Sequence, residues 1–200
     1  MFVQVIRGRA KDGPGLRKEM DRWREEIGPG AIGFLGSTAG VTEDGQFIVV
    51  ARFESEAAAR KNNERPEQDA WFKEFSTHLD GEPTFLDSTD VEEWMGGGDD
   101  SAGFVQIITG SVTDKEKLRA MWQSMDENQM AKMRPDLMGG LVTWDGNEFV
   151  QTIYFTSEKE ARAGESQGAP PEAQESMNEM GALMKNLEYI DLTEPQLYSP

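Results

Sequence analysis

The sequence contains one histidine, His78, so a single imidazole is available for proton transfer or metal ligation. Trp71 and Phe75 precede it at steps of four and three, and we expect these three side chains to share one helix face turned toward a sheet. A buried neutral imidazole can act as a general base near pH 7 or bind haem iron. A lone helical histidine is more often a hydrogen-bonded core or rim residue, and we rank that structural role first.

Polar residues also interrupt apolar runs at matching places. Gln4 and Gln106 lie in two nearly identical segments, and Arg52 and Tyr154 lie in another such pair. A buried polar group without a partner costs about 1–3 kcal/mol, so each glutamine must either pair inside the barrel or face a cavity. The simpler expectation is that the two glutamines pair with each other. Arg52 offers a cation for a carboxylate or phenolate, or an ion pair between sheets, and Tyr154 offers a hydroxyl donor.

Composition excludes several kinds of site. The 200 residues include no cysteine, which excludes thiolate catalysis and cysteine-ligated metal centres, and one histidine cannot build a multi-histidine metal site. We therefore predict no metal site. Twenty Lys and Arg against 37 Asp and Glu give a net charge of −17, which disfavours binding to nucleic acid or anionic membranes. With no signal-peptide pattern or long apolar run, we expect a cytoplasmic protein.

The sequence repeats itself. Phe2–Gly8 recurs as Phe104–Gly110 with five of seven residues identical, at an offset of 102. The same offset relates Gln46–Phe53 to Glu148–Phe155, and it drifts to 104 near the end of each copy. A glycine- and acid-rich stretch between the copies is typical of a linker. We predict a first copy over residues 1–94, a linker over 95–103 and a second copy over 104–200.

Each copy predicts the same order of elements. In the first copy these are a strand, a helix, two strands joined by a turn, a helical region and a last strand, over Phe2–Gly8, Leu16–Ile27, Phe34–Val41, Phe47–Phe53, Ser55–Leu79 and Thr84–Ser88. In the second copy Thr113 and Glu116 predict a capping box at the start of the first helix. The order β-α-β-β-α-β is the ferredoxin-like plan of the α+β class.

A four-stranded sheet with helices on one face leaves its other face uncovered. That face carries alternate residues of each strand and is largely apolar, so it must be covered. We expect the two copies to cover each other and close a pseudo-dimeric α/β barrel, in which a fused repeat replaces two-fold symmetry.

Two such repeats resemble the dimeric α/β-barrel superfamily, in particular its antibiotic-biosynthesis monooxygenase-like branch. The resemblance is carried by Phe2–Gly8, Phe47–Ala58 with its copy Phe149–Ala161, and Pro66–Phe75. It implies a pocket between each sheet and its helices. In related proteins that pocket hosts cofactor-free oxidation of polycyclic phenols to quinones, haem binding or degradation, or isomerisation of small molecules.

The resemblance also implies residue roles. Cofactor-free monooxygenases of this kind hold a phenolate and meet oxygen with Asn, Trp and Arg, and Asn62, Trp71 and Arg52 are residues of these types. The histidine common at the second helix is absent, since Lys61–Asn63 and Gly164–Ser166 take its place.

We therefore predict a protein that binds a small aromatic, polyketide-like molecule and resembles cofactor-independent monooxygenases, as an internal pseudo-dimer open to further homo-oligomerisation. The candidate catalytic residues are His78 and Asn62, and the candidate substrate-binding residues are Arg52, Trp71, Phe75, Tyr154 and Trp122. Two alternatives stay open: a ligand-binding or scaffold barrel without catalysis, and a haem protein with His78 as axial ligand.

Overall fold

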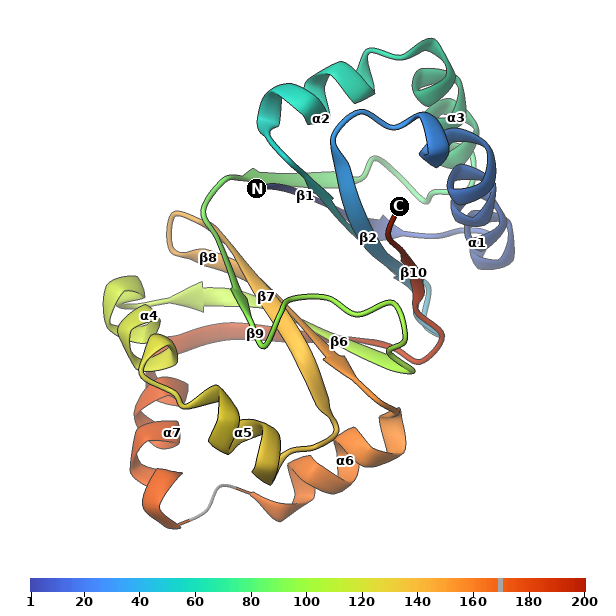
Figure 1. Cartoon of the computed structure of the whole chain (residues 1–200). Coiled ribbons are helices and arrows are strands. Elements are labelled where there is room, and N and C mark those ends of the chain that lie inside the picture. Colours follow the sequence, from blue (N-terminus) through green and yellow to red (C-terminus); the bar gives the residue numbers. More distant parts are fainter. Residues whose placement is uncertain (169–170) are drawn as a thin grey trace. The chain divides into compact units, whose positions relative to one another are not determined.

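The computed structural model of the protein describes residues 1–168 and 171–200. The chain divides into two compact units, residues 1–91 with 194–200 (unit 1) and residues 92–193 (unit 2). Each unit has a five-stranded sheet with its helices on one face (Figure 1). The α+β class and the two ferredoxin-like repeats are therefore confirmed. None of the described helices is long and apolar enough to cross a membrane.

Unit 1 has the strand order β10-β2-β3-β1-β4. Its strands are β1 (Phe2–Arg9), β2 (Phe34–Val41), β3 (Gln46–Phe53), β4 (Thr84–Ser88) and β10 (Gln196–Tyr198). Its helices are α1 (Gly13–Arg22), a π-helical turn η1 (Trp23–Ile27), a 3-10 turn η2 (Gly28–Gly30), α2 (Glu56–Asn63) and α3 (Pro66–Ser76).

Local signals explain where the unit 1 helices begin. The Asp12 side chain accepts a hydrogen bond from the Gly15 amide at 3.0 Å, and the Ser55 hydroxyl accepts one from the Ala58 amide at 3.2 Å, so each caps a helix. Pro66 opens α3, where its missing N–H costs nothing. Capping by Ser55 sets the position of α2 beside the end of β3.

Unit 2 has the strand order β5-β7-β8-β6-β9. Its strands are β5 (Val91–Trp94), β6 (Phe104–Val112), β7 (Leu137–Asp145), β8 (Glu148–Phe155) and β9 (Met184–Leu192). Its helices are α4 (Lys115–Gln123), α5 (Glu127–Met133), α6 (Glu158–Gln167) and α7 (Pro171–Leu183).

The predicted capping box in unit 2 is wrong by one residue. Asp114 is the cap, and its carboxylate accepts from the Lys117 amide at 3.0 Å. The Thr113 hydroxyl donates instead to the Leu183 carbonyl, at 3.3 Å. The helix therefore begins one residue later than the pattern predicted, and the residue at its N-cap position is an aspartate.

Two edge strands were not predicted. β10 pairs with β2, with Gln196 opposite Ala39 and Tyr198 opposite Ser37, and β5 lies beside β7. Figure 1 shows β10, in dark red, alongside the blue β2. Each sheet is therefore completed by a short strand that follows the other copy in sequence, and the compact units depart from the sequence copies at residues 92–94 and 194–200.

The helix-side core of each unit is aromatic. In unit 1 Leu16 and Phe47 are buried with Phe75 beneath α1 and α3. In unit 2 Leu118 and Trp144 are buried between α4 and the sheet. These cores fix the helices on the sheet and leave a pocket beside each core.

Candidate ligand-binding site

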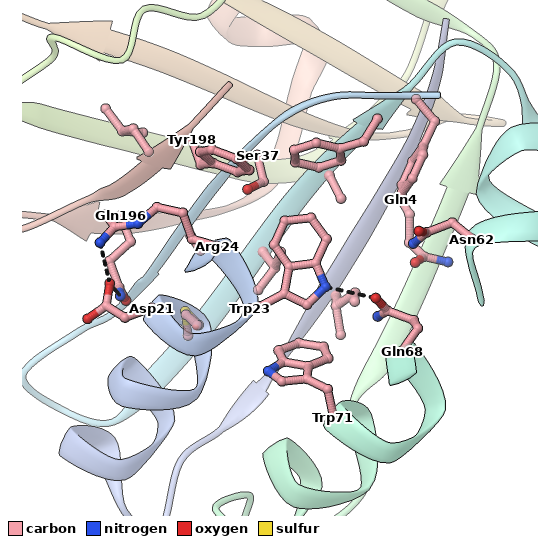
Figure 2. Close-up of a pocket in the computed structure, with 18 of the residues that line it drawn as sticks. Gln4, Asp21, Trp23, Arg24, Ser37, Asn62, Gln68, Trp71, Gln196 and Tyr198 are labelled. Carbon is pink, nitrogen blue, oxygen red and sulfur yellow. Dashed lines mark hydrogen bonds and ion pairs between the residues drawn. The ribbon is translucent and has the colours of Figure 1, made fainter. Parts of the chain in front are cut away.

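Unit 1 contains a pocket of about 80 Å³ between the helix face of its sheet and the helices above it (Figure 2). Strands β1, β2, β3 and β10 form its floor and one wall, and α1, η1, α2 and α3 form the rest. Five aromatic side chains line it: Trp23, Phe34, Phe53, Trp71 and Tyr198.

The aromatic walls are packed against one another. The Trp23 ring lies edge-on to Phe34, with ring centroids 4.9 Å apart, and edge-on to Trp71, with centroids 6.3 Å apart. Tyr198 is stacked on Phe34 at 5.7 Å. Edge-to-face and offset contacts at these distances are favourable, so the rings form a packed apolar surface.

Both indole N–H groups are anchored. Trp23 Nε1 donates to Gln68 Oε1 at 2.8 Å, and Trp71 Nε1 donates to the Glu19 carbonyl at 2.8 Å. Trp23 also begins the π-helical turn, a local irregularity that is frequent at functional sites. Turning either ring out of the pocket would break a hydrogen bond, which costs about 1 kcal/mol or more.

A bulge in β2 brings Phe34 and Ser37 to the same pocket. Residues three apart on a regular strand point to opposite faces. The pairing register of β2 shifts between Phe34 and Gly36, which marks a β-bulge. Gly36 has φ +146°, a conformation that residues other than glycine rarely adopt. The extra residue restores both side chains to the helix face.

Asn62 presents a hydrogen-bond donor to the pocket. Its residue exposure is 1%, and its Oδ1 accepts from Arg65 Nη1 at 3.0 Å and from the Ile32 amide at 3.4 Å. Because a guanidinium only donates, this contact identifies the oxygen of the Asn62 amide. Within the described part of the chain the other atom, Nδ2, makes no hydrogen bond.

Two glutamines present acceptors. Gln4 Nε2 donates to Asp87 Oδ1 at 3.0 Å, which leaves its Oε1 as an acceptor. Gln196 Nε2 donates to Asp21 Oδ1 at 2.9 Å and to the Arg17 carbonyl at 3.0 Å, and its Oε1 is buried without a partner among the described residues. A buried acceptor without a donor is a place where a ligand hydroxyl gains a full hydrogen bond.

Figure 2 shows how these polar groups are distributed. Gln4, Asn62 and Gln68 lie on one side of the two indoles, and Asp21, Arg24 and Gln196 lie on the other. The pocket therefore suits a flat molecule with an apolar body and oxygen atoms at opposite edges.

The predicted pairing of Gln4 with Gln106 is wrong. Gln106 Nε2 donates to Asp191 Oδ1 at 3.0 Å, as Gln4 does to Asp87. In both cases the aspartate is the register partner on the neighbouring strand, so a nearer acceptor satisfies each amide.

The structure brings together only some of the predicted site residues. Asn62 and Trp71 both line the unit 1 pocket. Phe75 lies behind Trp71, with ring centroids 5.0 Å apart, and supports that wall without lining it. Trp122 lines a different pocket, in unit 2.

Arg52 and Tyr154 lie on the face of their sheets opposite the helices. Arg52 is the register partner of Val3, whereas the partner of the pocket residue Gln4 is Ala51. Tyr154 likewise pairs with Val105, next to Gln106 in the strand. Adjacent strand residues point to opposite faces, so neither side chain reaches the pocket of its own unit.

His78 lies outside the pocket. Helix α3 ends at Ser76, so His78 stands in a turn and does not share a helix face with Trp71, which corrects that expectation. Its Nδ1 lies 2.9 Å from Asp12 Oδ2. The Gly15 amide, and after it His78, hold the pKa of Asp12 below its ordinary value. No three His, Asp or Glu side chains in the described residues come together as metal ligands would.

Unit 2 contains a larger pocket, of about 490 Å³, with different polar groups. The repeat offset places Gly164 where unit 1 has Asn62. A side chain at residue 164 would collide with the Arg134 guanidinium, which takes that space. Unit 2 therefore lacks the amide donor that distinguishes the unit 1 pocket.

No protein-family model and no curated protein matches the sequence. The fold does match solved structures. A candidate monooxygenase of Lactobacillus acidophilus NCFM superposes with a TM-score of 0.76 at 12% identity, covering 99% of this chain and 95% of that one. A candidate monooxygenase of Fusobacterium nucleatum gives 0.75 at 9% identity, covering 99% and 94%. An anthrone oxidase-like protein gives 0.63 at 12% identity, covering 98% and 93%.

These superpositions establish a shared fold. The predicted resemblance to monooxygenase-like ferredoxin folds is confirmed at that level. A shared fold does not determine the chemistry of the pocket.

Proposed function

We propose that unit 1 binds a small, flat, oxygen-bearing aromatic molecule and that the protein oxidises it with molecular oxygen, as a cofactor-independent monooxygenase. The observation that carries this proposal is the buried Asn62 amide beside aromatic walls. Its oxygen accepts from Arg65, and its N–H₂ group has no partner among the residues that the structure describes. An aromatic slot with one fixed donor is suited to hold a phenolate.

Each unpaired polar group of the pocket would have a hydrogen-bond partner on such a ligand. A phenolate or keto oxygen would accept from Asn62 Nδ2, and hydrogen bonds to an ionised oxygen are about twice as strong as neutral ones. Ligand hydroxyls would donate to Gln4 Oε1 and Gln196 Oε1, at opposite sides of the pocket. Trp23 and Trp71 would contact the ring system between them.

The pocket is too small for a fused-ring ligand unless one of its walls moves. Its 80 Å³ is about half of the ~150 Å³ cavity that holds one benzene, so a fused-ring ligand needs more room. The wall that can give way is β10, a three-residue edge strand whose Tyr198 is only partly buried. We propose that the ligand enters past Tyr198.

The proposed reaction needs no outside reductant. In an anthrone-type substrate the two C–H bonds of a ring methylene break, one oxygen atom of O₂ becomes a carbonyl, and the other leaves as water with the two hydrogens. The substrate supplies all four electrons. Asn62 would stabilise the enolate oxygen formed when the first proton leaves, and the shared fold of an anthrone oxidase-like protein supports this substrate class.

The test is oxygen uptake with anthrone in metal-free buffer, using protein without bound chromophores. Asn62→Asp keeps the shape and the Arg65 contact but loses the donor, so we expect the rate to fall at least tenfold, from the loss of about 1.5–3 kcal/mol. Asn147→Asp makes the same charge change at an exposed turn and should leave the rate unchanged. An unaltered rate in Asn62→Asp would contradict the assignment.

The alternatives give different results. Quenching of tryptophan fluorescence by anthrone without oxygen uptake would indicate a ligand-binding protein without turnover. A Soret band after haem addition that is lost in His78→Ala would indicate the haem protein instead.

A further inference from the structure

We infer that the pocket of unit 2 is a second, independent binding site, and that it takes a protonated aromatic amine. This inference does not rest on the function proposed for unit 1, because the two pockets share no lining residue. The unit 2 pocket lies between α4, α5 and α6 on one side and β5 to β8 on the other. Its volume of about 490 Å³ falls in the range of small-molecule sites.

The lining of this pocket differs from its unit 1 counterpart in charge. The offset of 102 carries Asn63 to Glu165, and the offset of 104 relates Gln196 to Glu92. Both replacements put a carboxylate where unit 1 has a neutral amide. The fold of the pocket is repeated, but its ligand chemistry is not.

Arg134 is the one cation among the described residues that line this pocket, and it is neutralised. Arg134 donates through Nε and Nη2 to the two carboxylate oxygens of Asp136, at 2.9 and 2.7 Å, and Asp136 is buried. The same contact raises the pKa of Arg134, which favours the charged guanidinium. A bidentate pair of this kind leaves no net positive charge to attract an anion.

Two of the lining carboxylates, both on exposed residues, have no ion pair within the described part of the chain. Glu92 accepts from Arg119 at 2.6 Å, and Glu165 lies 3.3 Å from Arg162. Glu127 accepts only from the Met95 amide, at 3.0 Å, and Glu93 has no ion pair among the described residues. The pocket therefore carries a net negative charge from Glu93 and Glu127.

A buried amide points to the same ligand class. Gln106 lines the pocket with a residue exposure of 6%. Its Nε2 donates to Asp191 at 3.0 Å, and its Oε1 has no partner in the described part of the chain. Gln106, Glu93 and Glu127 thus all offer acceptors, which an ammonium group with its three N–H donors can satisfy.

The apolar walls complete the match. Trp94 and Trp122 both line the pocket, and indole faces attract cations more strongly than other aromatic rings. Met125 and Met130 add flexible apolar surface for the body of the ligand. Carboxylates, unpaired acceptors and indoles around one space favour a cation with an aromatic body.

The experiment compares three probes of one shape on the full chain at pH 7: 2-phenylethylamine, which is protonated, 2-phenylethanol and 3-phenylpropionate. We expect the amine to bind at least tenfold more tightly than the other two, by calorimetry. In ¹⁵N–¹H spectra it should shift the indole signals of Trp94 and Trp122 and leave those of Trp23 and Trp71 in place. Assignments come from single Trp→Phe variants.

The matched variants separate local from general charge effects. The double variant Glu93→Gln, Glu127→Gln keeps the acceptor for the Met95 amide, and we expect it to weaken amine binding at least tenfold. The control Glu43→Gln, Glu82→Gln removes the same charge from exposed positions in unit 1 and should change nothing. Equal affinity for amine and alcohol, tighter binding of the propionate, or shifts confined to Trp23 and Trp71 would each overturn the inference.

Discussion

A single arginine determines what Asn62 can offer a ligand. Arg65 has a side-chain exposure of 12% and is held by the Ile27 carbonyl, at 3.3 Å, and by Glu67, at 2.8 Å. Its remaining donors fix the Asn62 oxygen, so the nitrogen is the only amide atom left for the pocket. Without Arg65 the amide could turn and offer either a donor or an acceptor, and the preference for an anionic oxygen would be lost.

At the residue scale we predict that Asp12 and His78 stabilise the fold. The lowered pKa of Asp12, caused first by the Gly15 amide and then by His78, means that the carboxylate form is favoured in the folded state. Such a group stabilises above its unfolded pKa, near 3.9, and this stability is lost as the pH falls through the lower folded value. Asp12→Asn keeps a capping side chain but removes the charge.

We therefore expect Asp12→Asn to lower the urea midpoint at pH 7 and to have a smaller effect at pH 3. Equilibrium unfolding followed by circular dichroism at both pH values measures this. An equal loss at pH 3 and pH 7 would show that the charge of Asp12 contributes nothing.

The sequence predicted residue types better than side-chain directions. Asn62 and Trp71 were found through the family resemblance, and both line the pocket. Arg52 was placed on the wrong side for that pocket because one position in a strand reverses the face, and both Ala51 and Phe53 do line it. His78 was misplaced because the end of α3 at Ser76 is not marked by a glycine or proline.

At the element scale the short strand β10 carries much of the pocket. It contributes the Tyr198 ring, stacked on Phe34 and edge-on to Trp23 at 6.2 Å, and the unpaired Gln196 oxygen. Neither residue was a sequence candidate. A strand of three residues is too short to show the alternation of apolar and polar residues that predicts a strand. Trp94 and Tyr198 are, however, related by the same offset of 104 that links the last strands of the two copies, and this match could have indicated a further strand in each copy.

We predict that Tyr198→Ala opens the unit 1 pocket at a cost in stability. Removing the ring should speed binding of anthrone-sized ligands, measured by stopped-flow fluorescence. Loss of about 1 kcal/mol of aromatic contacts should lower the unfolding midpoint of unit 1 by about 4–8 °C. Tyr189→Ala removes a tyrosine that is 55% exposed in unit 2 and is the control. Unchanged binding rates in Tyr198→Ala would contradict entry past this residue.

At the scale of the whole molecule, each repeat has a sheet face that its own helices do not cover. On the sheet face opposite its helices, unit 1 carries the apolar residues Val3, Val5, Ile48 and Val50. A unit alone would present this face to water. Repetition made the order of elements predictable. The edge strands were not predictable in this way, because β10 pairs with β2 across more than 150 residues of sequence, and β5 lies beside β7 across more than 40.

We predict that residues 1–94 expressed alone self-associate. The fragment exposes the apolar face and also lacks β10, so the edge of β2 is unpaired. Sedimentation equilibrium should give a mass at least twice that of the fragment, with the full chain as the reference. A compact, soluble monomer would contradict the expectation that each copy needs the other.

The unit 1 assignment is tested most directly by a crystal structure of the protein with 1,8-dihydroxyanthraquinone, a stable analogue of the proposed product. We predict electron density for the rings between Trp23 and Trp71, with Asn62 Nδ2 within hydrogen-bond distance of a ligand oxygen and Tyr198 displaced. Full occupancy of the ligand at any other place, with the unit 1 pocket empty, would contradict it.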